Sequence, residues 1–92
     1  MMAVNPRFPL GRLVATPNAI NALGHDDTVN ALNRHLSGDW GVLCEEDRKA
    51  NDRALVEGTR ILSVYHSVSG VKFWIITEAD RSATTVLLPE DY

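Results

Sequence analysis

The chain has 92 residues, 45% of them hydrophobic and 23% charged, with a formal net charge of −3 at pH 7. This length supplies one core, and the apolar fraction excludes a disordered chain. No apolar run approaches the roughly 20 residues that span a bilayer, and the first residues lack the apolar stretch of a signal peptide. We therefore expect one cytoplasmic domain over residues 1–92, with no membrane contact. Twelve acidic residues against nine basic ones argue against nucleic-acid binding, which usually needs a basic face.

The N-terminal third is predicted to hold a loose arm, a short extended segment and a helix. Residues 1–9 form the arm, and Gly11–Ala15 forms a strand or an extended lead-in. Thr16 is a favourable N-cap, Pro17 fits the first helical position, and Gly24 follows the last apolar residue of the pattern. These signals predict a short helix between Thr16 and Gly24.

Two further helices are expected before the β-rich part of the chain. One follows His25 and ends at Gly38, because its apolar residues recur at helical spacing. The other runs from about Glu45 to Glu57, where three acidic residues in the first turn favour the helix dipole. Gly58 is a natural terminating residue for it.

The last third is predicted to be an antiparallel β-meander. Arg60–His66, Val71–Glu78 and Ala83–Leu88 are rich in β-branched and aromatic residues. Ser69–Gly70 suits a two-residue hairpin turn, and residues 79–82 form the second turn. The expected fold class is therefore α+β: two or three short helices packed on a three-stranded antiparallel meander, with the N-terminal segment as a candidate added strand.

Both faces of this meander carry apolar side chains. With the expected turns, Val64 pairs with Ile75 and Ile75 with Val86. One face then holds Leu62, Val64, Phe73, Ile75, Val86 and Leu88, and the other holds Ile61, Tyr65, Trp74, Ile76 and Leu87. A sheet with one solvated face should alternate apolar and polar residues, and this one does not. The second face is expected to be covered by Phe8–Val14, by a second copy or another protein, or by a small molecule.

No motif for catalysis, metal binding or a cofactor is visible. His25, His35 and His66 are far apart and lack metal-ligand spacing, and Cys44 has no fixed partner for thiol chemistry. We therefore expect no metal and no cofactor, and the chain favours a non-enzymatic role. The face of Tyr65, Trp74, Ile76 and Leu87 is the candidate interaction surface for a protein partner or homodimer.

The polar stretch after the second strand has two interpretations. Asp80 and Ser82 can bond their own backbone as ordinary turn residues, with Arg81 in solvent. Alternatively, Glu78, Asp80 and Arg81 form a polar rim beside the aromatic face.

Several phrases of the sequence resemble one group of proteins. They are Phe8–Arg12, Ala15–Pro17, Gly38–Gly41, Trp74–Ser82 and Leu88–Tyr92. They resemble a group of short bacterial proteins that are often labelled hypothetical or "plasmid-related" and have no established activity. The resemblance implies a bacterial cytosolic setting, and it carries no functional residue with it.

A second analogy is one of topology alone. Helices followed by a three-stranded meander look like the RelE/ParE toxin fold, which implies action on RNA or pairing with an antitoxin. Toxins of this fold that act on RNA use basic and aromatic residues on the sheet. The residues of the same types here would be Tyr65, His66, Lys72, Arg81 and Tyr92. Fold alone does not give function, and the acidic balance argues against this alternative.

Overall fold

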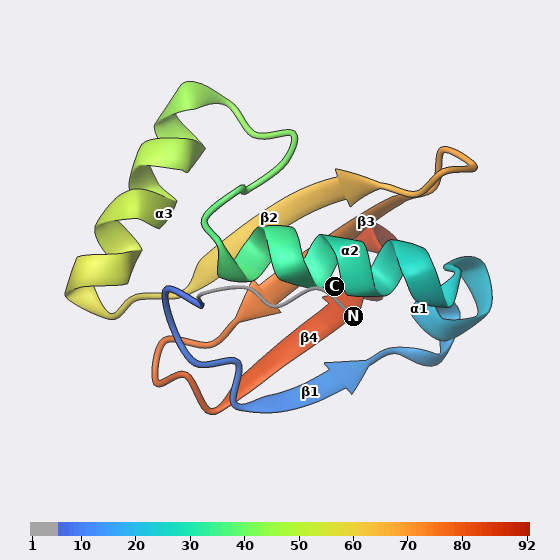
Figure 1. Ribbon diagram of the computed structural model, residues 1–92, viewed down its shortest axis with the longest axis horizontal. Helices are drawn as coiled ribbons and strands as arrows, with labels where there is room; N and C mark the ends of the chain where they lie inside the picture. The colour runs from blue at the N-terminus through green and yellow to red at the C-terminus, as the bar shows by residue number, and fades with distance from the viewer. Residues whose placement is uncertain (1–5) are drawn as a thin grey trace.

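The computed structural model describes residues 6–92, which form three α-helices, four strands and a short 3-10 turn (Figure 1). In chain order these are β1 (Arg12–Ala15), α1 (Pro17–Ala22), α2 (His25–Leu36), α3 (Glu45–Glu57), β2 (Ile61–His66), β3 (Lys72–Thr77), β4 (Ala83–Leu87) and the turn η1 (Pro89–Asp91). The strands lie in the order β1-β4-β3-β2. The α+β class is confirmed. The candidate N-terminal strand is present as β1. The expected antiparallel sheet is correct only in part, because β1 pairs parallel to β4 and makes a mixed sheet of four strands.

The helices begin and end where local chemistry favours it. The Thr16 hydroxyl accepts the Ala19 amide over 3.1 Å and caps α1, whose first residue is Pro17. Gly58 ends α3 with a left-handed φ of 73°, which glycine adopts at little cost. In Figure 1, α2 lies in front of the sheet, α1 lies at its right-hand end, and α3 lies beyond β2.

The N-terminal segment is part of the core over the residues that the structure describes. Phe8 is buried and packs with Trp40, Ala54 and Ile61, and the Arg7 amide donates to the Leu36 carbonyl over 2.9 Å. The predicted loose arm is therefore wrong for Arg7 and Phe8, whereas its residues 1–5 lie outside the described part. Since the chain then continues into β1 at the sheet edge, it does not cover the second face of the meander as one alternative expected.

The register between β2 and β3 differs from the prediction by one residue. Val64 lies opposite Trp74 rather than Ile75, while the expected pair of Ile75 with Val86 is present. The cause is the hairpin loop: Ser67 and Val71 still pair by a 2.9 Å hydrogen bond, so three residues rather than two make the turn. A shift of one residue moves every side chain of a strand to the opposite face.

The corrected register defines two faces. The first face packs against α1 and α2 and holds Ile61, Ser63, Tyr65, Phe73, Ile75, Thr77, Thr84 and Val86. The second face holds Leu62, Val64, Trp74, Ile76, Thr85 and Leu87.

The outer edge of β2 is protected by the loop that precedes α3. Val42 donates to the Val64 carbonyl over 2.8 Å, and Val64 donates to the Trp40 carbonyl over 3.1 Å. Gly41 lies between them with φ 80°, and a Cβ there would meet the Val64 oxygen at 1.9 Å. Only glycine permits this close approach, which removes an exposed strand edge.

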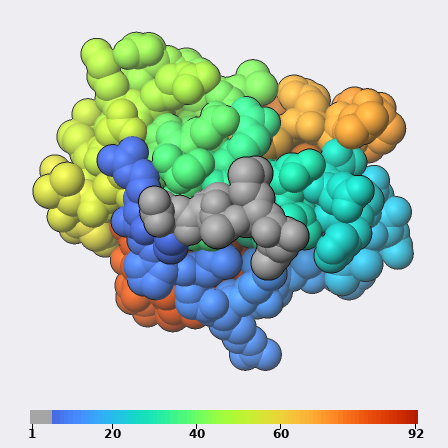
Figure 2. Space-filling view, in the orientation of Figure 1, coloured from blue at the N-terminus to red at the C-terminus, as the bar shows by residue number. Residues whose placement is uncertain are grey.

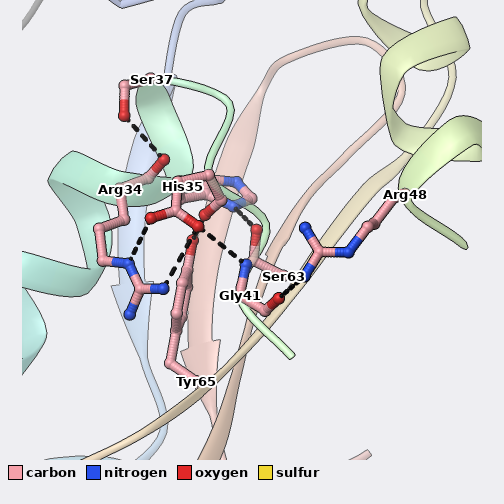
Figure 3. Close-up of polar contacts among 8 residues, drawn as sticks. Arg34, His35, Ser37, Gly41, Arg48, Ser63 and Tyr65 are labelled. Atoms are coloured by element: carbon pink, nitrogen blue, oxygen red, sulfur yellow. Dashed lines mark hydrogen bonds and ion pairs between the residues drawn. The ribbon is translucent and has the colours of Figure 1, made fainter. Parts of the chain in front are cut away.

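A chain of buried polar side chains crosses the first face. The His35 ring contacts the Ser63 hydroxyl through Nδ1 at 2.6 Å (Figure 3). Its Nε2 atom contacts the Thr77 hydroxyl at 2.9 Å. Thr77 and Thr84 bond each other at 2.8 Å, and Thr84 donates to the Leu10 carbonyl over 2.7 Å.

The last bond fixes the direction of all the others, because each hydroxyl has one proton to donate. Since Thr84 donates to Leu10, it accepts from Thr77, and Thr77 in turn accepts from His35 Nε2–H. Nδ1 of His35 is then the acceptor for Ser63. A neutral ring with its proton on Nε2 satisfies every group in the chain.

This buried hydrogen-bond network also predicts how the stability of the protein depends on pH. Burial, assisted by the charge of Arg81, lowers the pKa of His35 from its ordinary 6.5 to about 4. Between these values the unfolded chain binds the extra proton, so the free energy of unfolding falls as pH falls, by on the order of 3 kcal/mol. We expect His35→Gln to be less stable at pH 7 and to lose this part of the pH dependence in denaturant titrations.

His25→Gln is the matched control, because His25 is an exposed histidine. Its free energy of unfolding should depend on pH as that of the wild type does. The carboxylates are the same in all variants, so their contribution cancels when one pH profile is subtracted from another. A His35→Gln profile parallel to that of wild type would contradict the assignment.

Candidate functional site

A hollow of about 340 Å³ opens on the second face of the sheet. Its apolar lining comes from β2, β3, the loop before α3 and α3 itself. Its polar lining comes from α3, the residue before β2 and the C-terminus. The lining residues are Leu43, Asp47, Ala50, Asn51, Arg60, Leu62, Trp74, Ile76 and Tyr92. The hollow therefore joins parts of the chain that are far apart in sequence.

One residue that lines this hollow, Trp74, carries an unpaired hydrogen-bond donor. The Nε1 atom of Trp74 is buried and has no hydrogen-bond partner among residues 6–92. The other indole shows the usual arrangement, since Trp40 Nε1 donates to Asp52 over 3.0 Å. A buried donor without an acceptor costs roughly 1–3 kcal/mol. An acceptor that reached this nitrogen would recover the energy, and because the atom is enclosed, the Trp74 side chain must shift to meet it.

Arg60 and Tyr92 form one wall and carry its charge. The Arg60 guanidinium lies 5.4 Å from the Tyr92 ring centroid and donates to the Tyr92 hydroxyl over 2.7 Å. It also pairs with Glu78 at 3.7 Å, and the hydrogen bond to Tyr92 is the main cause of the raised pKa of Arg60. The Tyr92 ring in turn contacts Trp74 edge to face at 5.6 Å. A cation is thus held beside the unpaired indole.

The predicted interaction face is only partly assembled. Trp74 and Ile76 line the hollow, and Leu87 lies on the same face but is buried beside it. Tyr65 was placed on the wrong face, as a consequence of the register error. It is buried on the first face, where its hydroxyl donates to the Asp39 carbonyl over 2.6 Å and Arg34 lies 4.7 Å from its ring (Figure 3).

The predicted polar rim is also divided. Arg81 does not point to solvent, because its guanidinium donates to the Thr59, Ala54 and Glu78 carbonyls over 2.7, 2.9 and 3.2 Å. Asp80 accepts the Ser82 amide over 3.0 Å, as a turn residue does. Glu78 alone borders the hollow, through its pair with Arg60.

Sequence reasoning missed most of the lining. The lining residues not predicted are Leu43, Asp47, Ala50, Asn51, Arg60, Leu62 and Tyr92. Once the register is corrected, strand alternation places Leu62 on the face of Trp74. The contributions of α3 and Tyr92 carry no sequence signal, because they depend on how the chain folds back.

The residues singled out for other chemistry do not gather. His66 pairs with Lys72 at one end of β2 and β3, whereas Arg81 lies in the turn beyond the other end. Within residues 6–92, no group of His, Cys, Asp and Glu is arranged to hold a metal ion. In the same range no helix is long and apolar enough to cross a membrane.

Comparison of the chain with protein-family models, curated proteins and solved structures found no match. The resemblance to short bacterial proteins therefore stays a prediction, and the site is interpreted from its own geometry.

The position of α3 predicts a stability effect at the wall of the hollow. Asn51 donates to the Leu62 carbonyl over 2.7 Å and accepts the Leu62 amide over 3.2 Å, which joins α3 to the edge of β2. We expect Asn51→Ala to lower the free energy of unfolding by about 2 kcal/mol, since two backbone groups lose their partner.

Asn30→Ala on the exposed side of α2 is the control, and it should change stability by less than about 0.5 kcal/mol. Equal effects of the two substitutions in urea titrations would contradict the role given to Asn51.

Proposed function

We propose that this protein is a non-enzymatic interaction module of the bacterial cytoplasm, whose second-face hollow receives an apolar side chain of a partner protein. The observation that carries the proposal is the unpaired Nε1–H of Trp74, a residue that lines the hollow. A carbonyl of the partner's backbone, next to the inserted side chain, would accept this hydrogen bond.

The size of the hollow supports a protein segment as the occupant. Ligand pockets usually measure roughly 300–1,000 Å³, and about 340 Å³ is at the lower end of this range. Such a volume suits one large side chain, and a peptide also brings a backbone carbonyl close to that side chain. Leu62, Trp74 and Ile76 provide the apolar contact, and Trp is a residue in which binding energy often concentrates.

The charges beside the hollow indicate the sequence of the partner. Arg60 contributes a guanidinium that is already oriented by Tyr92, and oriented guanidinium groups bind carboxylates well. Asp47 lies in the lining contributed by α3, so an acidic group of the partner is disfavoured on that side and is favoured only beside Arg60. The preferred occupant is therefore an apolar residue with an Asp or Glu next to it.

The two tryptophans allow a test with an internal control. Peptides selected from a random display library should shift the indole Nε1–H signal of Trp74 in ¹H–¹⁵N spectra. The Trp40 signal should stay in place, because that donor is already bonded to Asp52. Selected peptides should share an apolar residue beside an acidic one.

Substitutions define the binding site further. Ala50→Phe, in the lining of the hollow, should abolish binding by filling it, and Trp74→Phe should weaken binding by removing the donor. Ala22→Phe on the exposed side of α1 is the matched control and should bind as wild type does. Peptides that bind Ala50→Phe as tightly as wild type, or a library that yields no binder, would contradict the proposal.

A further inference from the structure

The outer edge of β1 is an unpaired strand edge. β1 is the outermost strand of the sheet, and no strand among residues 6–92 pairs with its outer side (Figure 1). The amides of Arg12 and Thr16 donate to the Ser82 and Val86 carbonyls over 2.9 and 3.0 Å, on the side of β4. Because backbone groups alternate in direction along a strand, the N–H and C=O groups of Leu13 and Ala15 point to the open side.

We propose that this edge pairs with the same edge of a second copy of the chain, antiparallel, about a two-fold axis at Val14. In this arrangement Leu13 of each copy lies opposite Ala15 of the other, and the two residues exchange both backbone hydrogen bonds. A two-fold interface uses one surface twice, so the surface must complement itself. The proposal is independent of the hollow on the second face.

The apolar side chains of this edge fit the arrangement. Leu13 and Val14 are 52% and 39% exposed, and Ile20 of α1 is 64% exposed. Opposite residues of an antiparallel pair share a face, so Val14 would meet its own copy on the second face.

On the first face, a second hollow is placed to receive Leu13 of the other copy. This hollow, of about 260 Å³, has an apolar lining of Ala15, Ala19, Ile20, Leu23 and Val86. Ala15 is the residue that the pairing places opposite Leu13. Figure 2 shows the N-terminal segment, in blue, at the margin of the molecule where a second copy would approach.

The charges select a second copy over an unrelated peptide. The same axis places Arg12 of one copy opposite Thr16 of the other, and both side chains lie on the second face. The Thr16 hydroxyl donates to Asp91 over 2.6 Å, and Asn18 donates to the other carboxylate oxygen over 2.7 Å. These two bonds lower the pKa of Asp91, which is therefore charged at neutral pH. Each Arg12 would meet the fixed carboxylate of the other copy, so the contact occurs twice per dimer, and opposite charges across an interface favour the correct partner.

A charge exchange tests the proposal in sedimentation experiments on the full chain. Wild type should dimerise at micromolar concentrations. Arg12→Glu and Asp91→Arg should each be monomeric alone, because each brings like charges together twice, with the dissociation constant raised at least about tenfold. An equimolar mixture of the two should dimerise again, since both pairs then have opposite charges.

The matched control is Arg53→Glu, an equal change of charge on the exposed side of α3, which should dimerise as wild type does. If Asp91→Arg fails to fold, the dimerisation of Arg12→Glu compared with that of Arg53→Glu still tests the proposal. In addition, amide exchange at Leu13 and Ala15 should slow as protein concentration rises. A wild-type monomer at roughly 0.5 mM, or a dimer that Arg12→Glu leaves intact, would overturn the proposal.

Discussion

The buried chain from Ser63 through His35, Thr77 and Thr84 to the Leu10 carbonyl is the constraint on which the rest of the fold depends. It joins α2, three strands and the N-terminal segment in one network. Buried polar groups are costly unless they are paired, so a slip of one residue in any strand would break the network and expose apolar side chains. The network thereby assigns one face of the sheet to the helices and leaves Trp74 on the other.

Local chemistry was sufficient to predict the elements but not the pairing between them. The cap at Thr16, the glycine after α3 and the β-branched strands gave the right helices and the right class, because these signals act over a few residues. The register was wrong because the hairpin loop has three residues, and Ser69–Gly70 also suits a turn of two. His35 follows Leu32 on the buried side of α2, and this spacing was the available sign that its ring is in the core.

The candidate site shows a further limit of sequence reasoning. Trp74 and Ile76 were predicted to share an open face, and alternation along β3 is enough for that conclusion. Arg60 and Tyr92 could not be found in this way, since they are 32 positions apart and meet through tertiary folding. The open edge of β1 depends on the same kind of information, because a parallel neighbour for β4 has no local signal. The hollow on the second face and the open edge of β1 both depend on the strand arrangement that the His35 hydrogen-bond network holds in place.

The most direct test of this account is the protonation state of the His35 ring, measured by long-range ¹H–¹⁵N NMR. The directed chain predicts a neutral ring at pH 7 with its proton on Nε2, and it predicts that the ring stays neutral until the pH approaches about 4. A proton on Nδ1, or a ring that titrates near 6.5 as an exposed imidazole does, would contradict the network and with it the assignment of the two faces.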